Sequence, residues 1–178
     1  MVDANGGLIP ETAKRLFASL PNGLDFVLEA PCSTWLQTQA VRAISPYPII
    51  LDELAQSEAD VFTAGAMGTA DGIGLKISKA GGLTPGRRQR DIARAAGMTV
   101  SVQDTVGSSI AFSGILQLGA TVPDQLLRCV LNCEDMVTIK TATVDATFVD
   151  GGVLPGTTPG LGIEVDEAIL GTPVATWD

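Results

Sequence analysis

Short apolar runs alternate with longer segments of helical period along about two thirds of the chain. The apolar runs lack polar alternation, which is typical of strands that are buried on both faces of a parallel sheet. They predict six strands: Met1–Ala4, Asp25–Glu29, Pro48–Asp52, Gly72–Ile77, Thr99–Asp104 and Leu126–Asn132. The segments between them predict five helices: Pro10–Leu20, Thr34–Ile44, Glu58–Gly65, Pro85–Ala96 and Ser108–Leu118. The fold class is therefore α/β.

Local signals support these helices. Pro10 stands at the first position of the first helix, where its missing N–H is not needed. Ser33 is a candidate N-cap for the second helix. The helix Ser108–Leu118 is almost entirely apolar, so we expect it to be well buried. Repeated strand–helix units of this kind form either a doubly wound sheet or a (β/α)8 barrel.

The alternation of strand and helix patterns ends at about Thr138. The segment beyond it is rich in glycine and proline and contains short strand-like pieces. We expect it to leave the sheet and pack elsewhere, because its apolar side chains need burial. Those side chains are Val144, Phe148, Leu161, Ile163, Val165, Ile169 and Leu170.

Composition narrows the function classes. The 178 residues fit one domain, and the net charge of −9 argues against nucleic-acid binding. The chain has no apolar run long enough to span a membrane, and its three cysteines form no paired motif, so we expect a cytoplasmic protein with reduced thiols. The absence of histidine excludes a Ser-His-Asp triad, a His-ligated zinc and a histidine base from this chain.

Polar residues recur where each predicted strand ends. They are Asp3, Glu29, Asp52, Lys76, Asp104 and Asn132, which lie 23 to 28 residues apart. One such residue alone is more typical of a helix cap or a solvated loop. Six in register favour the barrel, because the strand ends of a barrel form a ring around the mouth where active sites lie.

Three neighbouring carboxylates, Asp3, Glu29 and Asp52, repel one another unless a cation neutralises them. Oxygen ligands without histidine or cysteine favour a hard divalent ion, with Mg²⁺ the first choice. Lys76 would face that ion, and both charge repulsion and desolvation would favour its neutral form. A neutral lysine can remove a proton α to a metal-bound carboxylate, since the metal stabilises the enediolate. We expect Lys79 to be a solvated loop residue.

Five segments resemble the enolase superfamily, most closely its mandelate racemase/muconate lactonizing enzyme group. In that family, the positions that match Asp3, Glu29 and Asp52 bind Mg²⁺, and the position that matches Lys76 is an acid/base lysine. The resemblance extends over essentially the whole chain. The segments are Val2–Leu8, Leu28–Trp35, Ile50–Leu54, Gly74–Thr84 and Thr158–Gly171.

The lack of histidine excludes the branch that uses a His–Asp dyad. The segments around residues 102–118 and 128–138 look most like dehydratases of cis-3-hydroxy-L-proline and the neighbouring proline-betaine epimerases. The resemblance implies α-proton removal by Lys76 and loss of the 3-hydroxyl, which gives Δ1-pyrroline-2-carboxylate. Asp104 would be the second catalytic residue, placed to meet the substrate amine, its hydroxyl or a catalytic lysine. The substrate-binding residues would be Trp35, Thr105, Asn132 and Cys133.

The resemblance also implies a division of the chain. Residues 1–137 would be a partial barrel, from its third to its eighth strand, and residues 138–178 a tail that closes the barrel and returns to a capping domain absent from this chain. Family members have that domain, two more βα units and an opposing lysine. We therefore expect a partner, either a separate chain or a missing parent segment, and a homo-oligomer of the complete unit.

Two other functions remain open. The same site could catalyse 2-epimerisation of a proline or proline-betaine derivative, since that reaction also begins with α-proton removal. The chain could instead be a catalytically silent structural half-barrel.

Overall fold

Six parallel strands form one curved sheet in chain order. The computed structural model describes residues 1–104, 107–131 and 136–176. The strands are β1 (Val2–Asp3), β2 (Leu28–Glu29), β3 (Ile49–Leu51), β4 (Gly72–Lys76), β5 (Thr99–Gln103) and β6 (Leu127–Val130), and every neighbouring pair is parallel. The strands are shorter than predicted, but all six lie within the predicted ranges.

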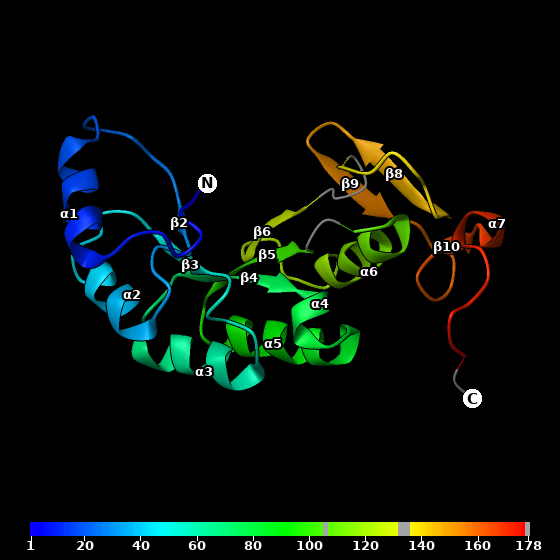
Figure 1. The fold of residues 1–178 in the computed structure, drawn as a ribbon, viewed down its shortest axis with the longest axis horizontal. Helices are drawn as coiled ribbons and strands as arrows, with labels where there is room; N and C mark the ends of the chain where they lie inside the picture. The colour runs from blue at the N-terminus through cyan, green and yellow to red at the C-terminus, as the bar shows by residue number, and fades with distance from the viewer. Residues whose placement is uncertain (105–106, 132–135, 177–178) are drawn as a thin grey trace.

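The helices follow the outside of this sheet. They are α1 (Pro10–Ser19), α2 (Trp35–Arg42), α3 (Glu58–Met67), α4 (Ile77–Ala80), α5 (Leu83–Ala95) and α6 (Ser109–Gly119). Figure 1 shows α1, α2, α3, α5 and α6 on an arc with the strands in its hollow. The arrangement is an open half-barrel, so the predicted α/β barrel fold is confirmed and the doubly wound alternative is excluded.

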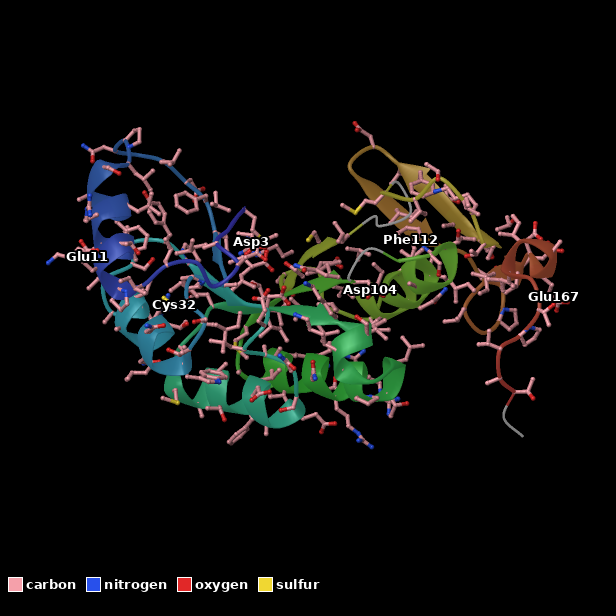
Figure 2. All side chains as sticks on the ribbon, in the orientation of Figure 1. Asp3, Glu11, Cys32, Asp104, Phe112 and Glu167 are labelled. Atoms are coloured by element: carbon pink, nitrogen blue, oxygen red, sulfur yellow. The ribbon has the colours of Figure 1, made fainter. Side chains whose placement is uncertain are left out.

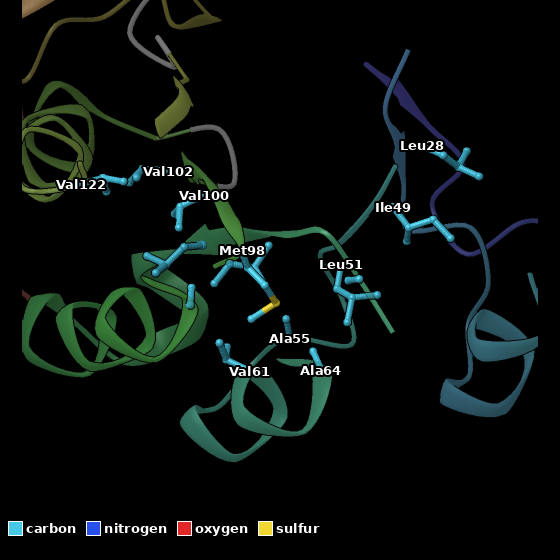
Figure 3. Close-up of a cluster of buried hydrophobic side chains, with 14 of the residues drawn as sticks. Leu28, Ile49, Leu51, Ala55, Val61, Ala64, Met98, Val100, Val102 and Val122 are labelled. Atoms are coloured by element: carbon cyan, nitrogen blue, oxygen red, sulfur yellow. The ribbon is translucent and has the colours of Figure 1, made fainter. Parts of the chain in front are cut away.

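Alternation along the strands separates the two faces of the sheet. Leu28, Leu51, Leu75 and Val102 are almost completely buried and belong to the main hydrophobic cluster, together with residues of the helices. Figure 3 shows strand residues of this cluster directed toward α3 and its neighbours. Because successive strand side chains point to opposite faces, the residues between these positions face the hollow.

The helix starts differ in detail from the predictions. Thr34, not Ser33, caps α2, because its side chain accepts a hydrogen bond from the N–H of Gln37. The prediction of a Ser33 cap was therefore wrong by one residue. The one-turn helix α4, directly after Lys76, was not predicted.

Asp71 joins three elements at the start of β4. Both of its carboxylate oxygens accept hydrogen bonds from Arg42, at 2.5 and 2.7 Å, and one of them also accepts from the N–H of Ile49 at 2.8 Å. Its carbonyl accepts from the N–H of Thr99. The residue before β4 therefore connects α2, β3 and β5.

The tail forms two antiparallel ribbons and one short helix. The ribbons pair β7 (Ala142–Val144) with β10 (Ile163–Val165) and β8 (Ala146–Val149) with β9 (Gly152–Pro155), and α7 covers Glu167–Leu170. The tail contacts α6, where Phe112 and Phe148 stack with ring centroids 6.3 Å apart. As predicted, α6 is mostly buried.

The expected burial of the tail is only partly observed. Val144, Leu161 and Ile163 are partly buried. Phe148, Val165, Ile169 and Leu170 are exposed, at 58%, 40%, 47% and 51%. The prediction was wrong for these four side chains, because the residues that the structure describes leave the outer surface of the ribbons and of α7 uncovered.

No helix within the described residues combines the length and the apolar character that a membrane crossing would need.

Phe112 offers a test of this packing. Its side chain is completely buried in the cluster beneath α6. We expect Phe112→Ala to lower the free energy of unfolding by about 3–5 kcal/mol, because a large cavity would remain. Urea unfolding followed by circular dichroism measures this loss. Phe62→Ala is the matched control, since Phe62 is 65% exposed, and an equal loss in both variants would contradict the assigned core.

Candidate active site

Five polar side chains lie on the face of the sheet opposite the hydrophobic cluster. Asp3 pairs with Glu29, Glu29 with Ile50, and Ile50 with Gly72. Asp52 lies two residues beyond Ile50, Lys76 four residues beyond Gly72, and Gln103 pairs with Lys76. These positions share one parity, so all five face the hollow. Figure 2 shows Asp3 in the middle of the molecule, between α1 and the tail.

Asp52 is the centre of this group. Its side chain is only 3% exposed, and it accepts hydrogen bonds from two lysines. Lys76 Nζ lies 2.5 Å from Oδ2, and Lys79 Nζ lies 2.8 Å from Oδ1. The buried carboxylate therefore has both oxygens neutralised by ammonium groups, as a buried charge requires.

Lys79 was expected to be solvated, and that expectation was wrong. Its side chain is 25% exposed and it binds Asp52. Lys79 lies on α4, one turn beyond Lys76, so the helical spacing returns the second ammonium to the same carboxylate. A prediction of α4 from the sequence would have placed Lys79 on the same side as Lys76 and so beside Asp52.

The pKa of Lys76 is raised in this environment. Burial acts to lower it, but the hydrogen bond that Lys76 donates to Asp52 and the charges of Asp52, Glu53 and Glu29 outweigh that effect. A bound cation beside Lys76 was expected to lower this pKa, whereas the chain's own groups raise it. The ion-paired lysine is protonated and can donate a proton from Nζ.

Glu29 is buried beside a residue that the sequence analysis missed. Its side chain is 3% exposed, and Oε1 accepts a hydrogen bond from Nε2 of Gln103 at 3.1 Å. Burial raises the pKa of Glu29, the Gln103 hydrogen bond opposes this, and the charges of Asp3 and Asp52 raise it further. The effect of Asp3 and Asp52 shows that the three carboxylates share one electrostatic environment.

The chain turns sharply after two of the acidic residues. Asp3 is exposed and accepts a hydrogen bond from the N–H of Asn5 at 2.8 Å. Asn5 and Ala30 have positive φ angles of 46° and 43°. Non-glycine residues in this region are strained, and such strain gathers at functional sites.

The other proposed pocket residues occupy different positions. Asp104 lies one residue beyond β5, half-buried, and accepts a hydrogen bond from Ser78 Oγ at 2.7 Å. Trp35 is partly buried and packs against the main hydrophobic cluster. Thr105, Asn132 and Cys133 lie outside the described residues.

The donor set fits a hard cation. Oxygen ligands from three carboxylates suit Mg²⁺, and two ammonium groups already occupy Asp52, which shows that this position attracts positive charge. In the present side-chain arrangement, no three such side chains among residues 1–104, 107–131 and 136–176 lie close enough to coordinate one ion. Coordination of one ion by all three carboxylates would therefore require their side chains to move.

A family model described as enolase C-terminal domain-like matches residues 1–169. The chain belongs to this family. Among curated proteins, this enolase-type chain is 30% identical over 177 residues to a cis-3-hydroxy-L-proline dehydratase of Roseibium aggregatum, covering 99% of the chain and 48% of that protein. It is 31% identical to an L-Ala-D/L-amino acid epimerase of Flavobacterium johnsoniae, covering 84% of the chain and 46% of that protein.

Comparison with solved structures also places the chain among enolase-type proteins. A protein from Aspergillus oryzae that is assigned to the mandelate racemase/muconate lactonizing enzymes is 55% identical, with a TM-score of 0.94, over 98% of this chain and 48% of its own. One from Roseovarius nubinhibens, in complex with magnesium, is 51% identical, with a TM-score of 0.95, over 99% of this chain and 48% of its own. The resemblance is confirmed, and the enolase-type chain spans about half the length of these relatives.

The raised pKa of Glu29 predicts a pH effect on stability. In the folded state, Glu29 keeps its proton to a higher pH than in the unfolded chain. The stability that this proton contributes is therefore fully present below pH 4.5, the ordinary pKa of a glutamate. It is lost as the pH rises through the folded-state pKa. We therefore expect Glu29→Gln, without added metal, to remove this loss and to be more stable than wild type at pH 7.

Urea unfolding between pH 4 and pH 7 measures the difference. Glu11→Gln is the control, since Glu11 is exposed and forms only a surface pair with Arg15. A pH profile of Glu29→Gln parallel to that of wild type would show that Glu29 does not carry the effect.

Proposed function

We propose that this chain supplies the Mg²⁺ ligands and one acid/base lysine of an enzyme that removes the proton α to a carboxylate. The observation that carries the proposal is the buried Asp52 with Lys76 and Lys79 at hydrogen-bond distance. This group lies at the carboxyl ends of parallel strands, where barrel enzymes have their active sites. Membership of the enolase-type family supports an enzymatic role.

Asp3, Glu29 and Asp52 would hold the ion. Bound Mg²⁺ would stabilise the negative charge that develops on a substrate carboxylate as the α-proton leaves. The carboxylates need this positive charge as much as the substrate does, because Glu29 and Asp52 are both nearly inaccessible to water.

Lys76 would move the proton at Nζ. Its position at the end of β4 fixes it beside Asp52, and its side chain is only 16% exposed. It acts as an acid while protonated and as a base after losing that proton. Lys79 keeps one cation on Asp52 when Lys76 changes its charge.

We infer that the substrate is cis-3-hydroxy-L-proline and the product Δ1-pyrroline-2-carboxylate. The dehydratase of R. aggregatum supports this choice, since it aligns over nearly the whole chain. The second candidate is 2-epimerisation of a proline or proline-betaine derivative on the same site, and the epimerase among the relatives supports it. Both reactions begin with the same proton transfer.

We also propose that the active unit includes a second polypeptide segment, about as long as this chain. The relatives are about twice as long. The sheet is open at both edges, with Val2 of β1 50% exposed and the middle of β6 exposed as well. Unpaired sheet edges favour association with another chain.

Replacement of Lys76 tests the mechanism. We expect Lys76→Ala in the complete enzyme to lower turnover by about 10²–10⁴-fold, the contribution of a positioned acid/base group. Mg²⁺ binding, measured by calorimetry, should persist because the carboxylates remain. Turnover at the wild-type rate would remove Lys76 from the mechanism.

Deuterium distinguishes the reactions. Incubation of the complete enzyme with cis-3-hydroxy-L-proline in D₂O should yield pyrroline-2-carboxylate, detected by mass spectrometry. Exchange at the α-carbon without loss of water, together with inversion of a proline betaine, would favour the epimerase. Neither exchange nor Mg²⁺ binding would favour the silent half-barrel.

The open edges predict the behaviour of the isolated chain. We expect size-exclusion chromatography to show association or aggregation in place of an 18.4 kDa monomer. A well-behaved monomer at all concentrations would contradict the proposed second segment.

A further inference from the structure

Glu29 lies against β4 at a position that has no side chain. A Cβ placed on Gly74 would lie 3.1 Å from Oε1 of Glu29 and 3.4 Å from Nε2 of Gln103. Gly74 has ordinary backbone angles, so no turn requires a glycine here. The missing side chain instead leaves room for the Glu29–Gln103 pair above the strand.

Gln103 holds the carboxylate from the next strand. It is 7% exposed and donates its Nε2 hydrogen bond to Oε1 of Glu29, which leaves Oε2 available to another partner. The contact joins residues 74 positions apart in the chain. Glu29 is therefore fixed by Gln103 on one side and by the surface of Gly74 beneath it.

We propose that Gly74 and Gln103 are positioning residues that hold Glu29 with Oε2 directed at the cation. The proposal rests on the proposed function for the role of Glu29 as a ligand. Neither residue touches the ion. They reduce the number of orientations that the carboxylate must give up when the ion binds, so they raise affinity without adding a ligand.

Two variants disturb this contact in different ways. Gln103→Met keeps length and volume but removes the donor, so Glu29 loses its hydrogen bond. Gly74→Ala keeps the donor but places a methyl group where the carboxylate lies, so Glu29 must shift by a few tenths of an ångström. Alanine is otherwise easier to accommodate in a strand than glycine.

Gln89→Met is the matched control. Gln89 is also buried, at 2% exposure, and donates one hydrogen bond from Nε2, to the carbonyl of Gln56 at 2.9 Å. This contact lies between α5 and the loop before α3, on the helix side of the sheet. Loss of a buried amide should therefore lower the free energy of unfolding in both methionine variants. Mg²⁺ affinity should fall only in Gln103→Met.

The measurement is calorimetric titration of the complete enzyme with Mg²⁺ alone, beside urea unfolding of each variant without metal. We expect Gln103→Met to weaken Mg²⁺ binding by at least about tenfold, as loss of a partner of a metal ligand commonly does. Gly74→Ala should weaken it several-fold while its unfolding midpoint stays equal to or above that of wild type. Gln89→Met should bind Mg²⁺ within twofold of wild type.

The outcomes separate the two proposals. A wild-type complete enzyme that binds no Mg²⁺ would contradict the proposed function. A wild-type enzyme that binds Mg²⁺, with Gln103→Met and Gly74→Ala no weaker than Gln89→Met, would overturn the positioning role alone. Loss of affinity in Gly74→Ala without loss of stability is the result that a purely structural role could not produce.

Discussion

A buried negative charge dominates this half-barrel. Asp52 is almost inaccessible to water and would be strongly destabilising there without a cation. Two lysines supply the compensating positive charge, and both come from the segment where β4 ends and α4 begins. The end of β4 places Lys76 beside this carboxylate, and α4 places the partly buried Lys79 beside it. Because the buried carboxylate requires a neighbouring positive charge, a divalent ion also suits the site.

The fold was largely predictable because it depends on a pattern that repeats. Each strand places apolar residues against the helices, and Leu28, Leu51 and Leu75 each directly precede the polar residue at the end of their strand. Burial of such residues fixes both the strand order and the face that is left polar. The tail follows no repeat, and it exposes Phe148 on β8 and Leu170 on α7, so its packing could not be derived from hydrophobicity alone.

The site was predictable where a residue ends a strand on the correct face. Asp3, Glu29, Asp52 and Lys76 meet that condition. Gln103 was not predicted because the charged residue after it, Asp104, also marks the end of the strand; β5 ends at Gln103, and alternation along β5 places Gln103 on the polar face. Gly74 could not be recognised, since only the folded structure shows which side chain lies above it.

The hydrogen bonds of Asp71 have a consequence for the tolerance of the chain to insertions and deletions. They fix Asp71, the residue before β4, to β3 and β5, and Lys76 follows five residues after Asp71. Slippage by one residue would send Lys76 to the helix side and bring Leu75 into the hollow. Length changes within this segment would thus exchange a charged site for an apolar one, whereas the glycine-rich turn after α4 could absorb them.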